Sequence, residues 1–300
     1  TLCWTLLWED AGLDAVPPDD LPVWHVFKQT GFASARTSWE EDALTLHLRS
    51  GRAAVSHSHI DVNNFLLNAG GEWLLRDYGY GEVGPGYFNR AIAYFSNATA
   101  AHNCLVIGEQ DQRTDDDSVG TITDAEERDG VVWFRSDATK TYEGAESVVR
   151  ELALVSPHGE TGKWGYVVVR DLAKTAAPET FDFMLNPGGE VAVEGDGFTI
   201  QGEHSRLVGK VLAPAGVTIE VLPGIGEHIN VEDPRCVRIR APEKASDVEF
   251  VVVLVPLAEG EDAPEIGALG AGAAGAQVGA DRILFSTDGR EPPRREAGQG

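Results

Sequence analysis

The stretch Ser56-His57-Ser58-His59-Ile60-Asp61-Val62-Asn63-Asn64-Phe65 contains two histidines two positions apart, and the segments that connect it to two later motifs alternate as β-strands do. Two shorter segments follow it, 75–81 (LRDYGYG) and 101–103 (AHN), and the three together hold three of the eight histidines. In a strand, residues i and i+2 project from the same face, so His57 and His59 should point the same way. The sequence therefore predicts that imidazole and carboxylate groups converge on one site.

Imidazole and carboxylate ligands without cysteine suit zinc or a similar divalent ion. An isolated His-x-His pair is more typical of a polar strand edge, but Asp77 and His102 each lie beside an apolar run and favour a site. Spacing alone would place both His57 and His59 on the metal.

The remaining chain has the pattern of many short strands. Runs rich in β-branched and aromatic residues occur at 44–48, 121–123, 131–134, 166–169 and 250–255. Turn-forming residues recur between them, as at 129–130, 186–189 and 195–197. Short strands with frequent turns predict an all-β fold, a large antiparallel β-sandwich.

Domain organisation follows from the flanking segments. Residues 1–10 have apolar residues at helical spacing and no initiator Met, so we interpret 1–22 as the end of a helical domain and a proline-rich linker. The sandwich is expected over 23–286, with a loose Gly/Ala/acid-rich segment at 258–280 and a last strand at 283–285. Residues 287–300 carry no core residues and are predicted to be disordered.

Charge and composition exclude several classes of partner. The net charge of −24 argues against nucleic acid and anionic membrane surfaces. No apolar run is long enough to span a bilayer, and no signal-peptide pattern is visible. The three scattered cysteines predict no disulfide framework, and nothing in the sequence predicts an oligomeric state.

Four segments together resemble the heparinase II/III-like polysaccharide lyases over roughly residues 22–112. They are 32–39 (FASARTSW), the His-x-His-x-Asp-x-Asn-x-Phe pattern at 57–65, 71–81 (GEWLLRDYGYG) and 102–108 (HNCLVIG). The resemblance implies that His57 is catalytic and that His59, Asp77 and His102 are zinc ligands. It also implies a zinc that shapes the site rather than binding substrate, and a secreted or periplasmic location.

The same resemblance implies cleavage of a uronic-acid-containing polysaccharide by β-elimination. A base must remove the C5 proton, an acid must protonate the leaving oxygen at C4, and the substrate carboxylate must be neutralised. His57 with Tyr87 or Tyr94 fits the first two needs, and Arg90 is a candidate clamp for the carboxylate. In these lyases an N-terminal helical toroid supplies the main catalytic Tyr, so we expect this chain alone to be weak or inactive.

Other polar residues complete the candidate site. Asn63 and Asn64, with Asp61, are candidates for fixing the imidazoles or binding the substrate, and a structural position at a turn is nearly as well supported for Asn63 or Asn64. Because the chain is strongly acidic, an acidic polysaccharide requires either a low charge density or a local basic lining, with Arg52, Arg76 and Arg90 as candidates.

Two other functions remain open at this stage. Cupin-like oxygenases or isomerases also place His-x-His and a distant His inside a β-sandwich. They usually add a Glu shortly after the pair, where this chain has Asn63 and Asn64. The other alternative is a non-catalytic carbohydrate-binding sandwich in which zinc only stabilises the fold.

Overall fold

A computed structural model describes residues 12, 16–53, 59–79, 97–159, 161–223, 235–270 and 274–296. The helical elements that lie wholly within these ranges are three short 3-10 turns, η1 (Pro18–Asp20), η4 (Thr99–Ala101) and η5 (Thr139–Thr141). Everything else that is regular is strand, so the predicted all-β antiparallel sandwich is confirmed. None of the described helical elements is long and apolar enough to cross a membrane. The helix predicted at 1–10 falls outside the described residues.

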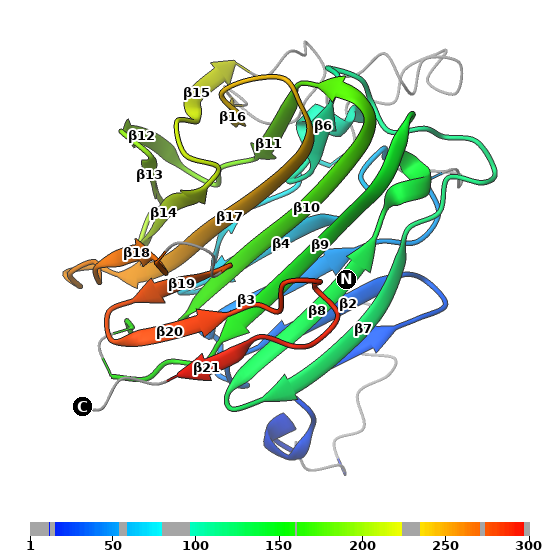
Figure 1. Ribbon diagram of the computed structural model, residues 1–300. Coiled ribbons are helices and arrows are strands. Elements are labelled where there is room, and N and C mark those ends of the chain that lie inside the picture. Colours follow the sequence, from blue (N-terminus) through cyan, green and yellow to red (C-terminus); the bar gives the residue numbers. More distant parts are fainter. Residues whose placement is uncertain are drawn as a thin grey trace, which may run out of the picture.

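Four antiparallel sheets make up the fold (Figure 1). The first sheet contains, in order, β1 (Trp24–Phe27), β2 (Phe32–Arg36), β3 (Thr45–Arg49), β4 (Asn64–Ala69) and β5 (Glu72–Leu75). The eight-stranded sheet has the order β12 (Glu190–Glu194), β13 (Gly197–Gln201), β14 (Ser205–Ala213), β17 (Ala245–Ala258), β10 (Tyr166–Glu179), β9 (Ala145–Val155), β8 (Val131–Asp137) and β7 (Thr121–Arg128).

Two smaller sheets complete the layers. The third sheet has the order β15 (Thr218–Pro223), β16 (Arg235–Arg240), β11 (Phe181–Leu185) and β6 (Leu105–Ile107). The fourth has the order β18 (Ile266–Ala268), β19 (Gly275–Val278), β20 (Asp281–Leu284) and β21 (Arg294–Glu296). In Figure 1 the fourth sheet lies in front of the eight-stranded sheet and the first sheet behind it.

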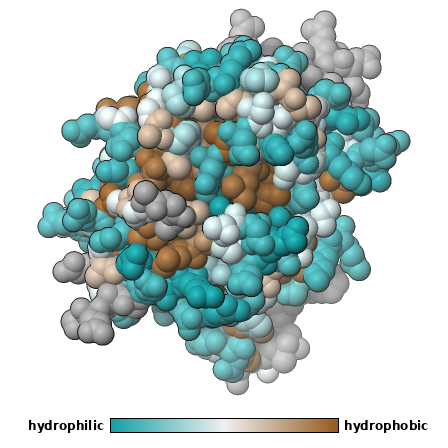
Figure 2. All heavy atoms as spheres, viewed as in Figure 1, coloured by the Kyte–Doolittle hydropathy of each residue, from teal (hydrophilic) through white to brown (hydrophobic). Residues whose placement is uncertain are grey.

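The main core lies between one face of the eight-stranded sheet and the first and third sheets. Alternate residues supply it from each side, including Leu46 and Leu48 of β3, Phe183 of β11 and Phe250 of β17. The period-2 geometry of strands sends these residues inward and their neighbours outward. A second core fills the space between the other face of the large sheet and the fourth sheet. Seen from the same side as in Figure 1, the surface of the molecule is largely hydrophilic, with a hydrophobic area at its centre (Figure 2).

The structure corrects two predictions about the C-terminal part. The segment 258–280, expected to be loose, contributes β18 and β19, and its Ile266, Ala276 and Val278 are buried in the second core. The segment expected to be disordered from 287 contains β21, which pairs with β20. A buried ion pair between Arg295 and Asp281, with an N–O distance of 2.5 Å, holds it. Polar contacts therefore order a strand that brings almost no apolar surface.

Arg150 of β9 is the largest charged side chain in the main core. Its Nε and Nη2 donate to the two carboxylate oxygens of Asp171 on β10, at 2.7 and 2.6 Å. Its Nη1 donates to the backbone carbonyls of Asn63 and Asn103, each at 2.5 Å. Burial by itself would lower the pKa of Arg150, but the charge of Asp171 raises it, so the guanidinium stays charged. This one side chain thus joins the large sheet to the segments that precede β4 and β6.

Replacing Asp171 with Ala should leave the buried Arg150 charge without its partner. We expect the Asp171→Ala variant to lose about 3–5 kcal/mol of unfolding free energy, measured by urea denaturation. Glu220→Ala is the matched control, because it removes an ion pair with Arg238 whose carboxylate is exposed, and such pairs contribute less than about 1 kcal/mol. Similar losses in both variants would contradict this role for Arg150.

Candidate metal centre

His59, Asp77 and His102 lie at the ends of regular elements and not within strands. His59 is in the loop before β4, Asp77 is two residues after β5, and His102 directly follows η4. The prediction that a strand runs through His59 is therefore wrong. Asn63 adopts a left-handed backbone with φ of 67°, and the Asn64 amide closes a turn onto the Asp61 carbonyl, so the strand begins only at Asn64.

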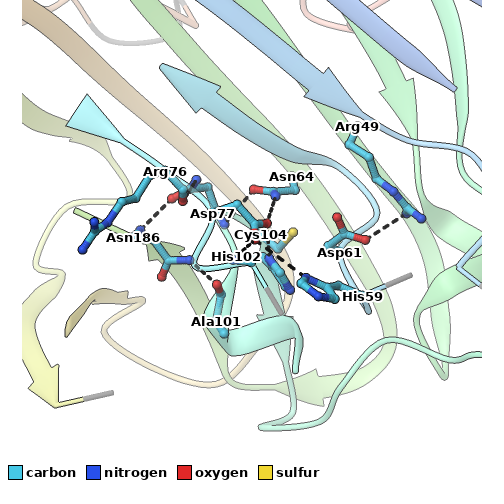
Figure 3. A network of polar contacts seen from close by, with 12 residues as sticks. Arg49, His59, Asp61, Asn64, Arg76, Asp77, Ala101, His102, Cys104 and Asn186 are labelled. Carbon is cyan, nitrogen blue, oxygen red and sulfur yellow. Dashed lines mark hydrogen bonds and ion pairs between the residues drawn. The ribbon is translucent and has the colours of Figure 1, made fainter. Parts of the chain in front are cut away.

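The three side chains converge from these separate segments (Figure 3). His102 Nδ1 is 3.0 Å from Asp77 Oδ2, and His59 Nδ1 is 3.7 Å from Asp77 Oδ1. One candidate ligand atom from each residue lies within 4.8 Å of the other two. Neighbouring ligands of a tetrahedral zinc, each at about 2 Å, are about 3.3 Å apart. Small side-chain adjustments therefore suffice to bring all three onto one ion.

The Asp77 carboxylate is held by three hydrogen bonds. Oδ1 accepts from the Gly79 amide at 2.7 Å, and Oδ2 accepts from the Asn64 side-chain amide at 3.2 Å as well as contacting His102. Burial by itself would raise the pKa of Asp77, but the hydrogen bond and charge of His102 outweigh it and lower the pKa to about 2. Asp77 is consequently an anion throughout the physiological pH range, as a metal ligand must be.

The two imidazoles differ in environment. Burial lowers the pKa of His59, which favours the neutral, metal-binding form. Burial would also lower the pKa of His102, but the hydrogen bond and charge of Asp77 raise it, so metal binding there has to displace a proton. His102 is fully buried, and its Nε2 has no hydrogen-bond partner among the described residues. Two imidazoles, one of them with an orphaned buried nitrogen, and one carboxylate fit a zinc ion.

Asn103 and Asn64 connect this group to the fold. The Asn103 amide donates to Asn64 Oδ1 at 3.0 Å, and the Asn103 side chain donates to the Phe65 carbonyl at 2.7 Å. Asn103 Oδ1 accepts from the Asn186 amide at 2.6 Å. Asn64 is thereby fixed between Asn103 and Asp77 and contacts the Asp77 carboxylate, while its role in fixing an imidazole or binding substrate stays a prediction. Asn63 is buried and donates weakly to the Ser136 carbonyl at 3.5 Å, so it faces the interior.

A cavity of about 650 Å³ opens beside this group, lined by His59, Asp77 and Asn64 at one end. The Asp77 side chain is 26 % exposed toward solvent, so the group is accessible from one side. An accessible side is what a zinc site needs if water or substrate is to occupy the remaining position. Asp61 also lines the cavity, and Arg49 neutralises it at 3.2 Å.

Several predicted site residues lie away from the cavity, and others lie outside the described residues. Among the candidates for a basic lining, Arg52 lines the cavity, whereas Arg76 lines a separate one and points away from the ligand group in Figure 3. His57, Tyr87, Tyr94 and Arg90 lie outside the described residues. The sequence interpretation missed Arg150 and Asp171, although a charged residue inside an apolar strand run was a visible signal.

A heparinase III and a heparan sulfate lyase are among the solved structures that share this fold. A heparinase III aligns with a TM-score of 0.73 and 17 % identity, covering 95 % of this chain and 43 % of its own. Heparan sulfate lyase HepC from Pedobacter heparinus aligns with a TM-score of 0.71 and 15 % identity, covering 93 % of this chain and 43 % of its own. The chain thus spans less than half the length of these enzymes.

No curated protein sequence matches the chain. Residues 20–245, however, match the C-terminal domain of heparinase II/III-like proteins. This match covers most of the β-sandwich and includes every candidate ligand. The chain therefore belongs to the heparinase II/III-like family.

Proposed function

We propose that this chain is the zinc-binding sandwich of a longer polysaccharide lyase that cleaves a uronic-acid-containing polysaccharide by β-elimination. The observation that carries the proposal is the convergence of His59, Asp77 and His102, within 4.8 Å of one another, at the end of an open cavity. Family membership favours this activity over a cupin-like enzyme and over a purely binding module. Because the chain covers 43 % of the heparinase III structure, we assign the missing catalytic groups to other parts of the protein.

The chemistry assigns separate roles to the residues of this chain. Zinc, when bound, supplies a fixed positive charge that holds the two imidazoles and the carboxylate in one arrangement. Asn64 orients Asp77 by its hydrogen bond of 3.2 Å. His57 precedes His59 by two residues, and we propose that it accepts or donates the transferred proton. Tyr87, Tyr94 and Arg90 are the proposed partners for the leaving oxygen and the substrate carboxylate. As the family resemblance implies, we place the enzyme in the periplasm or outside the cell.

Removing a metal ligand should release the zinc ion and lower the stability of the fold. We expect the purified chain to contain one zinc per molecule and His102→Ala to lose it, as measured by inductively coupled plasma mass spectrometry. Because zinc binds only the folded site, adding a chelator should lower the melting temperature of the unmodified chain but hardly that of the variant. His25→Ala, at an exposed strand position, is the control and should keep its zinc. A zinc-free unmodified chain would refute the metal assignment.

The role of His57 can be separated from that of the ligands. In the full-length protein we expect His57→Ala to keep its zinc and its melting temperature while product formation falls by roughly 100-fold or more, the usual scale for a positioned acid or base. Zinc loss in this variant would instead make His57 a ligand, and unchanged turnover would remove it from the mechanism.

The activity itself is tested on a panel of uronate polymers. β-Elimination leaves a double bond between C4 and C5 of the new end, and the conjugated product absorbs ultraviolet light. The full-length protein should therefore raise the ultraviolet absorbance with at least one polymer, and neutral glucans should give no signal. Absence of product with every uronate polymer would exclude the proposed function.

A further inference from the structure

The outer face of the first sheet has a composition unlike the rest of the molecule. Strand alternation turns a set of side chains away from the core, namely His25, Phe27, Phe32, Ser34, Arg36, Thr45, His47, Arg49, Leu66 and Asn68. Among these outward positions of β1–β4 no residue is acidic, although the chain has 48 acidic and 24 basic residues. The face is therefore a basic and aromatic surface on an acidic protein.

This face continues directly from the candidate metal centre. The cavity beside the ligands is lined further along by Phe32, His47 and Leu66, three outward residues of adjacent strands. Beyond them is Trp73 of β5, which is 46 % exposed and has its ring 5.7 Å from that of His47. Trp73 pairs with Asn68 of β4. Asn68 lies four residues after Asn64 on the same strand, so about 13 Å of strand separates Asn64 from the position of Trp73.

The charges along this face suit an anionic ligand. The two carboxylates that line the cavity are both engaged, Asp61 by Arg49 and Asp77 by the histidines. Arg52 also lines the cavity, and its side chain is 50 % exposed. Its ion pair is with Asp116, a side chain that is almost fully exposed, and such pairs contribute little and exchange readily. By contrast, the cavity at Arg76 and Arg235 is also lined by Glu190 and Glu203.

We propose that this face is a binding track for an anionic saccharide chain, running from the metal centre to Trp73. The inference rests on the proposed function. It adds the residues that bind the sugar units lying at a distance from the cleaved bond. One face of a sugar ring consists of C–H groups and packs on an aromatic ring, here Trp73 with His47 beside it. Arg52 supplies the positive charge for a carboxylate or sulfate near the metal centre. Burial and the charge of Arg36 lower the pKa of His47, so its ring is neutral at neutral pH and presents an uncharged surface to the sugar.

Binding of a uronate-containing hexasaccharide from heparan sulfate to the 300-residue chain tests the track, by isothermal titration calorimetry at two salt concentrations. We expect Trp73→Ala to raise the Kd about 5-fold, the scale of one aromatic contact. Arg52→Gln should raise it about 3-fold and flatten its salt dependence, as for an exposed ion pair. Arg128→Gln, on β7 and equally exposed, is the control and should change neither.

Further outcomes separate the saccharide-binding track from the proposed lyase activity. Absence of hexasaccharide binding to the unmodified chain, or unchanged Kd in both variants, would overturn the track. A chain that dimerises in sedimentation and becomes monomeric with Trp73→Ala would assign the face to a second copy instead. If the full-length protein turns over a polymer but Trp73→Ala leaves KM unchanged, the track fails and the lyase stands. If hexasaccharide binding depends on Trp73 but no polymer is cleaved, the track stands and the lyase fails.

Discussion

The buried ion pair between Arg150 and Asp171 is the interaction on which the site depends. A guanidinium in the core is costly to desolvate, and only a full set of partners offsets that cost. Here the partners are one carboxylate in a two-point contact, two backbone carbonyls, and the rings of Phe65 and Phe183 at 5.1 and 5.2 Å. Removing the Asp171 carboxylate leaves an unpaired charge in the interior, and removing the guanidinium leaves the carboxylate and both carbonyls without their donor.

The carbonyls that Arg150 binds belong to the segments that carry the candidate ligands. Asn103 follows His102 directly, and Asn63 precedes Asn64, whose amide holds Asp77. A continuous chain of hydrogen bonds therefore leads from the core, through Asn103 and Asn64, to the carboxylate between the two imidazoles. This explains how residues in loops reach a defined geometry: polar contacts to a rigid sheet replace the strand backbone that would otherwise fix them.

Local patterning predicted the strands and the sandwich because burial on one side of a sheet imposes a period of two on the sequence. The ligand set followed from the family motif, and the structure brings its three members together. The turn at Asn63 was only one of two interpretations, because a pair of asparagines suits a turn about as well as a place beside the imidazoles. The fourth sheet was predicted only in its β20, as the strand at 283–285, and its other strands were missed for a different reason. Its β21 has no apolar residue, and its pairing depends on the contact between Arg295 and Asp281, which are fourteen positions apart. The partner of Arg150 likewise lies on another strand, so the sequence showed the charge but not its pairing.

The central claim is that a polar network anchored in the core presents His59, Asp77 and His102 to one zinc ion. The most direct test is a crystal structure of the zinc-treated chain, with anomalous diffraction recorded on both sides of the zinc absorption edge. The account predicts a single strong peak about 2.0–2.2 Å from one atom of each of the three side chains, with Asn64 still bonded to Asp77. No peak at this position, or a zinc whose ligands exclude Asp77, would contradict it.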